Sequence, residues 1–281
     1  MNNNYILNRV FSQNTLKEIT QNGNSIVLDN AFSFYFQNKN EDLKNIDKFH
    51  ELYSVLTKQY RNEYFYKNTI INKLLLGRHS VNTTTALSEI PLGKSKADIV
   101  LINGKAVVYE IKTQLDSLDR LDNQILDYYK VFDHVEIITD DSHFNKIMEK
   151  YSETSVGIST LTKKNTISQK KKPEKNTSLL EHNTIYKTLR KEERKQLISH
   201  FYGDIPIFDQ FSEYKEMQKM FCQIEMQELY KEFLKEMKKR SLIKYYKEEF
   251  MAVPYELKSL LYFSSLKKGE YKILKNALEE A

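Results

Sequence analysis

The residues best suited to chemistry lie between residues 98 and 112, where two acids and a lysine accompany two apolar runs. Side chains alternate across a strand, so Glu110 and Lys112 point to the same face, about 7 Å apart. Asp98, from the preceding apolar run, would add a second carboxylate to that face. Carboxylates supply the oxygen ligands that Mg²⁺ or Mn²⁺ prefers. Lys112 would orient an attacking water or offset developing negative charge.

The face on which Asp98 lies depends on the turn between the two runs. The dipeptide Asn103-Gly104 predicts a β-hairpin. A two-residue turn would pair Asp98 with Tyr109 and put Asp98 on the opposite face from the other charges. A three-residue turn with a bulge beside the glycine would pair Asp98 with Val108 and keep the charges together. The metal site requires this second turn or an equivalent bulge.

Apolar periodicity predicts the elements that carry these residues. The expected order is a helical region over 47–76, strands over 86–90, 97–102 and 106–111, a helix over 118–132, a strand over 135–139, a helix over 142–151 and a strand over 156–161. This order predicts an α/β fold with a central mixed sheet flanked by helices. The two central runs are continuously apolar, as in strands covered on both faces. Burying a charge in such a strand costs free energy, so charged residues there indicate a function.

The spacing of the charged residues resembles the PD-(D/E)XK nuclease superfamily. Glu110-Ile111-Lys112 begins twelve positions after Asp98, and Ala97 stands in place of the proline. On the following helix, Gln124 and Tyr128 resemble the Gln-x-x-x-Tyr element of its exonuclease branch. Over about residues 60–162 the amino-acid sequence is also similar to that of an uncharacterised bacterial family within the same superfamily.

The resemblance implies a restriction-endonuclease-like fold and a role for each matching residue. Glu63, on the helix before the first strand, stands where these folds often place an additional acidic ligand. The implied metal ligands are Glu63, Asp98, Glu110 and the carbonyl of Ile111, and the implied catalytic residues are Asp98, Glu110, Lys112 and Gln124. Tyr128 would stack on the nucleic acid or hydrogen-bond near it.

Other basic residues could bind phosphates. Arg120 precedes Gln124 by four positions, so both lie on one helical stripe. Residues 1–160 contain 18 Lys and Arg against 20 Asp and Glu, whereas the remainder contains 25 against 18, within a net charge of +5. Lys170, Lys171 and Lys172 belong to a Lys-rich stretch that either grips phosphates or is a solvated linker.

We therefore expect a nuclease-like domain with an N-terminal helical segment over 1–162, a Lys-rich linker over 163–176 and a basic all-α domain over 177–281. The single cysteine excludes an internal disulfide and a multi-thiolate zinc site, and it suits a reducing cytoplasm. The sequence shows no secretory signal, no run long enough to span a bilayer and no phosphate-cradling glycine loop, so neither a membrane nor a nucleotide cofactor is expected.

The expected function is Mg²⁺- or Mn²⁺-dependent hydrolysis of DNA, by analogy in phage defence, restriction or repair. Two alternatives remain: a non-catalytic nucleic-acid-binding or regulatory protein on the same fold, and a helical interaction module. A homodimer is also left open.

Individual residues have simpler interpretations as well. Glu110 and Lys112 could be a solvated ion pair at a strand end, Glu63 could pair with Lys67 along its helix, and Tyr128 could be a packing residue.

Overall fold

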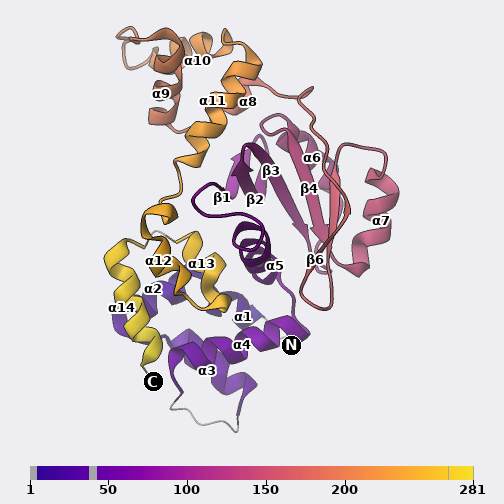
Figure 1. The fold of residues 1–281 in the computed structure, drawn as a ribbon, viewed down its shortest axis with the longest axis vertical. Helices are drawn as coiled ribbons and strands as arrows, with labels where there is room; N and C mark the ends of the chain where they lie inside the picture. Colours follow the sequence, from indigo (N-terminus) through magenta and orange to yellow (C-terminus); the bar gives the residue numbers. More distant parts are fainter. Residues whose placement is uncertain (1–4, 38–42, 265, 281) are drawn as a thin grey trace. The chain divides into compact units, whose positions relative to one another are not determined.

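The computed structural model describes residues 5–37, 43–264 and 266–280 (Figure 1). Its tertiary contacts define two compact units, which we call the helical unit and the sheet unit. The helical unit comprises residues 1–82, 161–167 and 242–281, and the sheet unit comprises residues 83–160 and 168–241. Each unit therefore combines segments that are far apart in the sequence.

The described part of the helical unit consists of helices and their connections. From the N-terminal segment come α1 (Tyr5–Val10), α2 (Gln13–Asn22), α3 (Ile26–Tyr35), α4 (Asn45–Gln59), α5 (Glu63–Ile70) and the π-helix η1 (Ile71–Leu75). From the C-terminal segment come η2 (Ile243–Tyr246), α12 (Lys247–Met251), η3 (Tyr255–Leu257), α13 (Lys258–Tyr262) and α14 (Lys268–Glu279). The expected helical region over 47–76 is thus interrupted before Asn62, whose side chain caps α5.

Buried asparagines join the N-terminal and C-terminal segments of the helical unit. The Asn45 amide donates to the carbonyl of Ala277 at 2.8 Å. The Asn68 amide donates to the carbonyl of Tyr255 at 3.0 Å, and its oxygen accepts from the backbone N–H of Ser259 at 2.9 Å. Residues 242–281 therefore group with the N-terminal helices, whereas the sequence assigned them to a domain over 177–281. These partners are about two hundred positions apart, so no local pattern reveals them.

The sheet unit is built on a six-stranded mixed sheet with the order β1-β2-β3-β4-β5-β6. The strands are β1 (Thr85–Leu92), β2 (Ser95–Asn103), β3 (Lys105–Lys112), β4 (His134–Thr139), β5 (Gly157–Leu161) and β6 (Ile167–Lys171). Strands β1, β2 and β3 pair antiparallel, and β3, β4 and β5 pair parallel. The expected α/β fold with a central mixed sheet is confirmed.

Strand β6 occupies part of the segment that the sequence predicts to be a linker. It is an edge strand with two lysines and largely accessible side chains. Charged residues of this kind keep a sheet edge from pairing with other chains, and they also hide the strand from a search for apolar alternation. The Lys-rich composition therefore predicts a linker, whereas in the structure the backbone of this segment is paired in the sheet.

The helices of the sheet unit share one apolar core with one face of the sheet. They are α6 (Leu121–Tyr129), α7 (Asp141–Tyr151), α8 (His182–Thr188), α9 (Lys191–Tyr202), α10 (Glu213–Cys222) and α11 (Met226–Lys238). Val108 and Ile137 of the sheet belong to the same buried cluster as Ile125 of α6, Tyr186 of α8 and Phe233 of α11. The C-terminal region is helical as expected, but α8 to α11 complete the sheet unit. Among the described residues, no helix has the length and apolar character needed to cross a bilayer.

We expect Asn68→Ala to lower the free energy of unfolding of the helical unit by roughly 2–3 kcal/mol, because it leaves buried partners without hydrogen bonds. The Asn68 side chain is fully buried, and its amide also donates to the hydroxyl of Tyr53. Chemical denaturation measures the change. The matched control is Asn72→Ala, which removes bonds nearer the surface. Equal effects of the two substitutions would contradict the structural role given to Asn68.

Candidate active site

The β2–β3 hairpin places Asp98 on the same face as Glu110. The register pairs Asn103 with Lys105 around Gly104, whose φ is 72°. Continued to the end of the ladder, this register sets Asp98 directly opposite Glu110, and directly opposed side chains share a face. The turn is neither of the two considered from the sequence. Like the three-residue turn, it puts Asp98 on the same face of the hairpin as Glu110 and Lys112. The requirement for the metal site is therefore met by a tighter turn.

Glu110, Lys112 and Gln124 form a closed triangle of polar contacts between β3 and α6. Lys112 Nζ lies 2.9 Å from Glu110 Oε1 and donates to Gln124 Oε1 at 2.9 Å. Gln124 Nε2 donates to Glu110 Oε1 at 2.7 Å. Glu110 is 1% exposed and Lys112 is 7% exposed. The pair is therefore a buried ion pair and not the solvated strand-end pair of the simpler interpretation.

Tyr128 holds the second oxygen of Glu110. Its hydroxyl lies 2.5 Å from Glu110 Oε2 and 3.0 Å from the carbonyl oxygen of Lys96. The side chain is 0% exposed, which contradicts the stacking on a base that the resemblance implies, and a hydrogen bond near the nucleic acid stays a prediction. Gln124 and Tyr128 are four positions apart on α6 and therefore face the same strand. Tyr128 positions Glu110 from within the core.

Burial decides the electrostatics of this cluster. It raises the pKa of Glu110, and the Lys112 ammonium together with hydrogen bonds from Tyr128 and Gln124 offsets only part of that rise. Burial and the neighbouring Glu110 charge also raise the pKa of Tyr128, which keeps this phenol neutral and able to donate. Burial thus makes the charged form of Glu110 more costly than in water, and a carboxyl group with a shifted pKa of this kind is a candidate functional group.

Asp98 is held beside this cluster in a more accessible position. Its Oδ2 accepts from the backbone N–H of Ile111 at 2.7 Å, and the residue is half-buried. This bond orients one carboxylate oxygen of Asp98. The assignment of the Ile111 carbonyl as a further ligand stays a prediction.

Glu89 on β1 is a candidate site residue that the sequence reasoning missed. The pairs Ser88 with Ile99 and Ile90 with Ala97 bracket it, so Glu89 lies across the ladder from Asp98. Carboxylate oxygens of Glu89 and Asp98 lie within 4.8 Å of each other, and Glu89 also forms an ion pair with Lys96. Its φ of 56° is a left-handed conformation that costs a non-glycine residue roughly 1–3 kcal/mol. The available signal was its antiparallel position opposite Asp98, which required the register to be known.

The other residues singled out from the sequence lie in different surroundings. Glu63 begins α5 of the helical unit, is 55% exposed and pairs with Lys67 at 2.5 Å along its helix, and its role as a metal ligand stays a prediction. Arg120 is exposed at the N-terminal end of α6. Lys170 and Lys172 are exposed at the edge strand.

Lys171 requires a correction. Its Nζ donates to the carbonyls of Tyr151, Thr154 and Val156, where it closes the turn after α7. An ammonium has three N–H donors, so these carbonyls satisfy it completely. Lys171 is therefore a structural residue and not a phosphate ligand.

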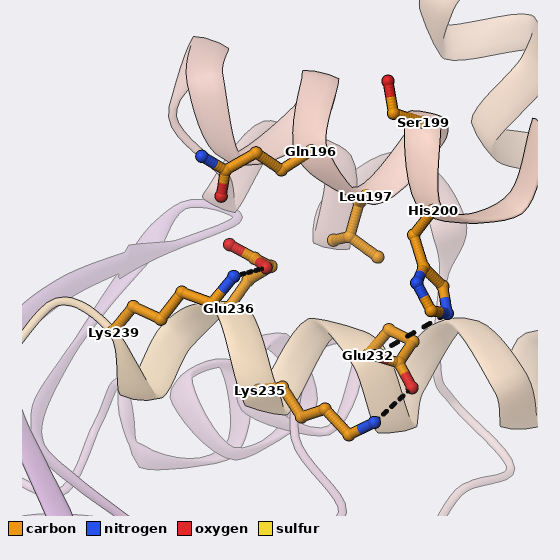
Figure 2. Close-up of a pocket in the computed structure, with 8 residues that line it drawn as sticks. All are labelled: Gln196, Leu197, Ser199, His200, Glu232, Lys235, Glu236 and Lys239. Atoms are coloured by element: carbon orange, nitrogen blue, oxygen red, sulfur yellow. Dashed lines mark hydrogen bonds and ion pairs between the residues drawn. The ribbon is translucent and has the colours of Figure 1, made fainter. Parts of the chain in front are cut away.

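A cavity of about 550 Å³ lies between α9 and α11 (Figure 2). Figure 2 shows that its acids face lysines one turn away on α11: Glu232 pairs with Lys235 at 2.6 Å, and Glu236 pairs with Lys239. His200 lies 3.9 Å from Glu232. Each pair joins a largely buried glutamate to an exposed lysine one turn away, and pairs at this spacing stabilise a helix weakly and offer no converging ligand set. The buried cluster on β3 and α6 is the stronger candidate for chemistry.

The sheet and its site define an α/β protein with a buried carboxylate–lysine–glutamine cluster between a central strand and the helix that follows it. The family model of bacteriophage P4 protein cII matches residues 57–273. The chain belongs to this family, and the matched range covers all six strands and the helices α8 to α11. No curated protein and no solved structure matches the chain.

We expect Lys112→Met to lower the free energy of unfolding by about 3–5 kcal/mol, because it leaves the Glu110 charge buried without its partner. The double substitution Glu110→Gln with Lys112→Met should recover most of that loss, since the amide can still accept from Gln124 and donate to the Tyr128 hydroxyl. Urea denaturation of the wild type, both single variants and the double variant measures the coupling. Additive effects of the two substitutions would refute the buried pair.

The raised pKa of Glu110 also predicts a pH dependence. The folded protein binds this proton more tightly than the unfolded chain, so the stability contribution is complete below the ordinary value of 4.5 and is lost as pH rises through the folded-state pKa. Tyr128→Phe removes a hydrogen bond that lowers this pKa, so Glu110 should titrate at higher pH than in the wild type. Carboxyl NMR measures the titration. Tyr230→Phe, which removes a bond to Asp133 instead, is the control and should leave Glu110 unchanged.

Proposed function

We propose that this protein is a metal-dependent nuclease that hydrolyses phosphodiester bonds in DNA. The observation that carries the proposal is the convergence of Asp98, Glu110 and Lys112 on one face of the β2–β3 hairpin, with Gln124 bonded to both members of the ion pair. Supporting it, these residues lie on strands followed by a helix and a parallel strand, in keeping with the motif between strands and before a helix on which the resemblance to the PD-(D/E)XK nuclease superfamily rests.

The donor atoms suit Mg²⁺ or Mn²⁺. Asp98 and Glu110 offer carboxylate oxygens from opposed positions, and Glu89 adds a third carboxylate next to Asp98. The oxygens of Glu110 accept from Lys112, Gln124 and Tyr128, while a carboxylate has about four acceptor positions, so capacity for a ligand remains. A bound divalent ion would polarise the scissile phosphate and lower the pKa of a coordinated water.

The chain's own groups then have distinct tasks. Lys112 has three N–H donors, and Glu110 and Gln124 take two of them in the described structure, so the third can orient the attacking water or bind the phosphate. Gln124 fixes the ammonium and the carboxylate at once, which reduces the reorganisation needed during reaction. Tyr128 fixes the other carboxylate oxygen and excludes water from the core side of the site.

A non-catalytic nucleic-acid-binding or regulatory protein is the second candidate. The observation that favours it is the near-complete burial of Glu110 and Lys112, whose charges satisfy each other without any ligand. In that case the cluster would specify how α6 packs on the sheet, and phosphodiester hydrolysis would be absent.

The decisive variant is Asp98→Asn, which keeps the acceptor for the Ile111 N–H and removes a charged ligand. We expect cleavage of linear and closed circular DNA in Mg²⁺ or Mn²⁺, no cleavage in EDTA, and a loss of at least about 100-fold in Asp98→Asn. Mn²⁺ binding by isothermal titration calorimetry should weaken in the same variant. Asp119→Asn, an exposed acid on the loop before α6, is the matched control. DNA that is bound but left intact with every metal would reject the nuclease and favour the second candidate.

A further inference from the structure

A large basic groove opens beside the candidate active site, within the sheet unit. It has a volume of about 1210 Å³ and is lined by the β1–β2 turn, by α6 and by α8. Among the described residues that line it, the charged side chains are Lys94, Lys96, Arg120, Lys130 and Lys187, and the carboxylate is that of Asp127. The groove therefore has a strongly positive lining within a chain whose positive and negative charges are otherwise mixed.

Asp127 makes one wall of the groove rigid. Its carboxylate accepts from the backbone N–H of Lys94 at 3.1 Å, from the hydroxyl of Ser95 at 2.8 Å and from Lys130 Nζ at 2.9 Å. Gly93, with φ of 61°, lets the turn approach so closely that a Cβ there would lie 2.8 Å from Asp127 Oδ1. The β1–β2 turn is thus tied to α6, and Asp127 is occupied by these donors.

Three cations remain available to a ligand. Lys94, Arg120 and Lys187 are exposed, and the described residues give none of them an ion-pair partner. They come from the β1–β2 turn, the start of α6 and α8 respectively, so three different elements contribute positive charge to the groove. Gln124 lines the same groove and donates to Glu110 in the buried cluster. Gln124 therefore links the groove to the candidate active site.

We propose that this groove binds the sugar-phosphate backbone of duplex DNA and leads the strand to Gln124. The choice of DNA as the ligand rests on the proposed function. The positive charge of the groove and its link to the candidate active site through Gln124 do not depend on that function. None of the described residues that line the groove is aromatic, whereas proteins that hold single strands stack the bases on aromatic rings. Phosphates are what such a surface recognises, and a duplex presents phosphates with its bases turned inward.

This assigns a function to α8, which the sequence placed in a separate basic domain. Lys187 lies in the last turn of α8, and Tyr186 beside it is buried in the core shared with the sheet. Packing of α8 on the sheet unit therefore sets the position of one wall of the groove.

The test is binding of a short labelled DNA duplex in EDTA, by fluorescence anisotropy over a series of salt concentrations. The triple variant Lys94→Ala, Arg120→Ala, Lys187→Ala should bind at least about 10-fold more weakly and show a salt slope shallower by roughly 2.7, because each phosphate contact contributes about 0.9. The matched control removes the same charge elsewhere on the sheet unit, at Lys105, Lys146 and Lys215, all of them exposed. That control should keep the wild-type slope.

Binding in EDTA is measured without cleavage, so the two proposals can fail separately. If the triple variant binds DNA more weakly but the protein never cuts DNA, the proposal that the groove binds DNA is supported and the proposed nuclease function is rejected. If the groove variant and the control variant show equal salt slopes of DNA binding in a protein that cuts DNA, the proposal that the groove binds DNA is wrong. Tighter binding of the corresponding single strand than of the duplex would also overturn it.

Discussion

Two opposite charges, the carboxylate of Glu110 and the ammonium of Lys112, lie side by side almost out of contact with water. Removing each charge from water costs several kcal/mol, and mutual attraction offsets that cost only where hydrogen bonds satisfy the remaining donors and acceptors. The Gln124 amide and the Tyr128 hydroxyl supply those bonds. The position of α6 on the sheet is constrained by this requirement, because a shift by one residue would turn both side chains away from β3.

The same helix is tied at a second place. Asp127 binds the β1–β2 turn through backbone and side-chain donors, and Gly93 permits the close approach. Tyr128 reaches the carbonyl of Lys96 just beyond that turn. Helix α6 therefore links the antiparallel and parallel halves of the sheet, and one set of contacts both stabilises the fold and arranges the polar cluster. Buried polar networks of this kind are either fully satisfied or destabilising, so their geometry tolerates little variation.

The polar cluster and the basic groove meet at Gln124, which contributes to both. A buried ion pair by itself is compatible with a structural role, and a basic groove by itself is compatible with simple binding. Their link through Gln124 is what favours the proposed reaction on a polyanion, because a groove that binds phosphates would hold them next to the residue that contacts Glu110. The left-handed conformation of Glu89 beside Asp98 adds local strain of the type that gathers at functional sites.

Local sequence determined the strands and helices around the site and which residues share a face. Alternation puts Glu110 and Lys112 together, and the spacing of four puts Gln124 and Tyr128 on one side of α6, since both periodicities are properties of the backbone. Tertiary structure decided the rest. The β2–β3 register depends on the conformation at Gly104, the burial of Tyr128 and the capping by Lys171 depend on elements packed from elsewhere, and β6 is recognisable only beside β5. The division of the C-terminal helices between two units likewise rests on partners far away in the chain, such as Asn68 with Ser259, which no local pattern encodes.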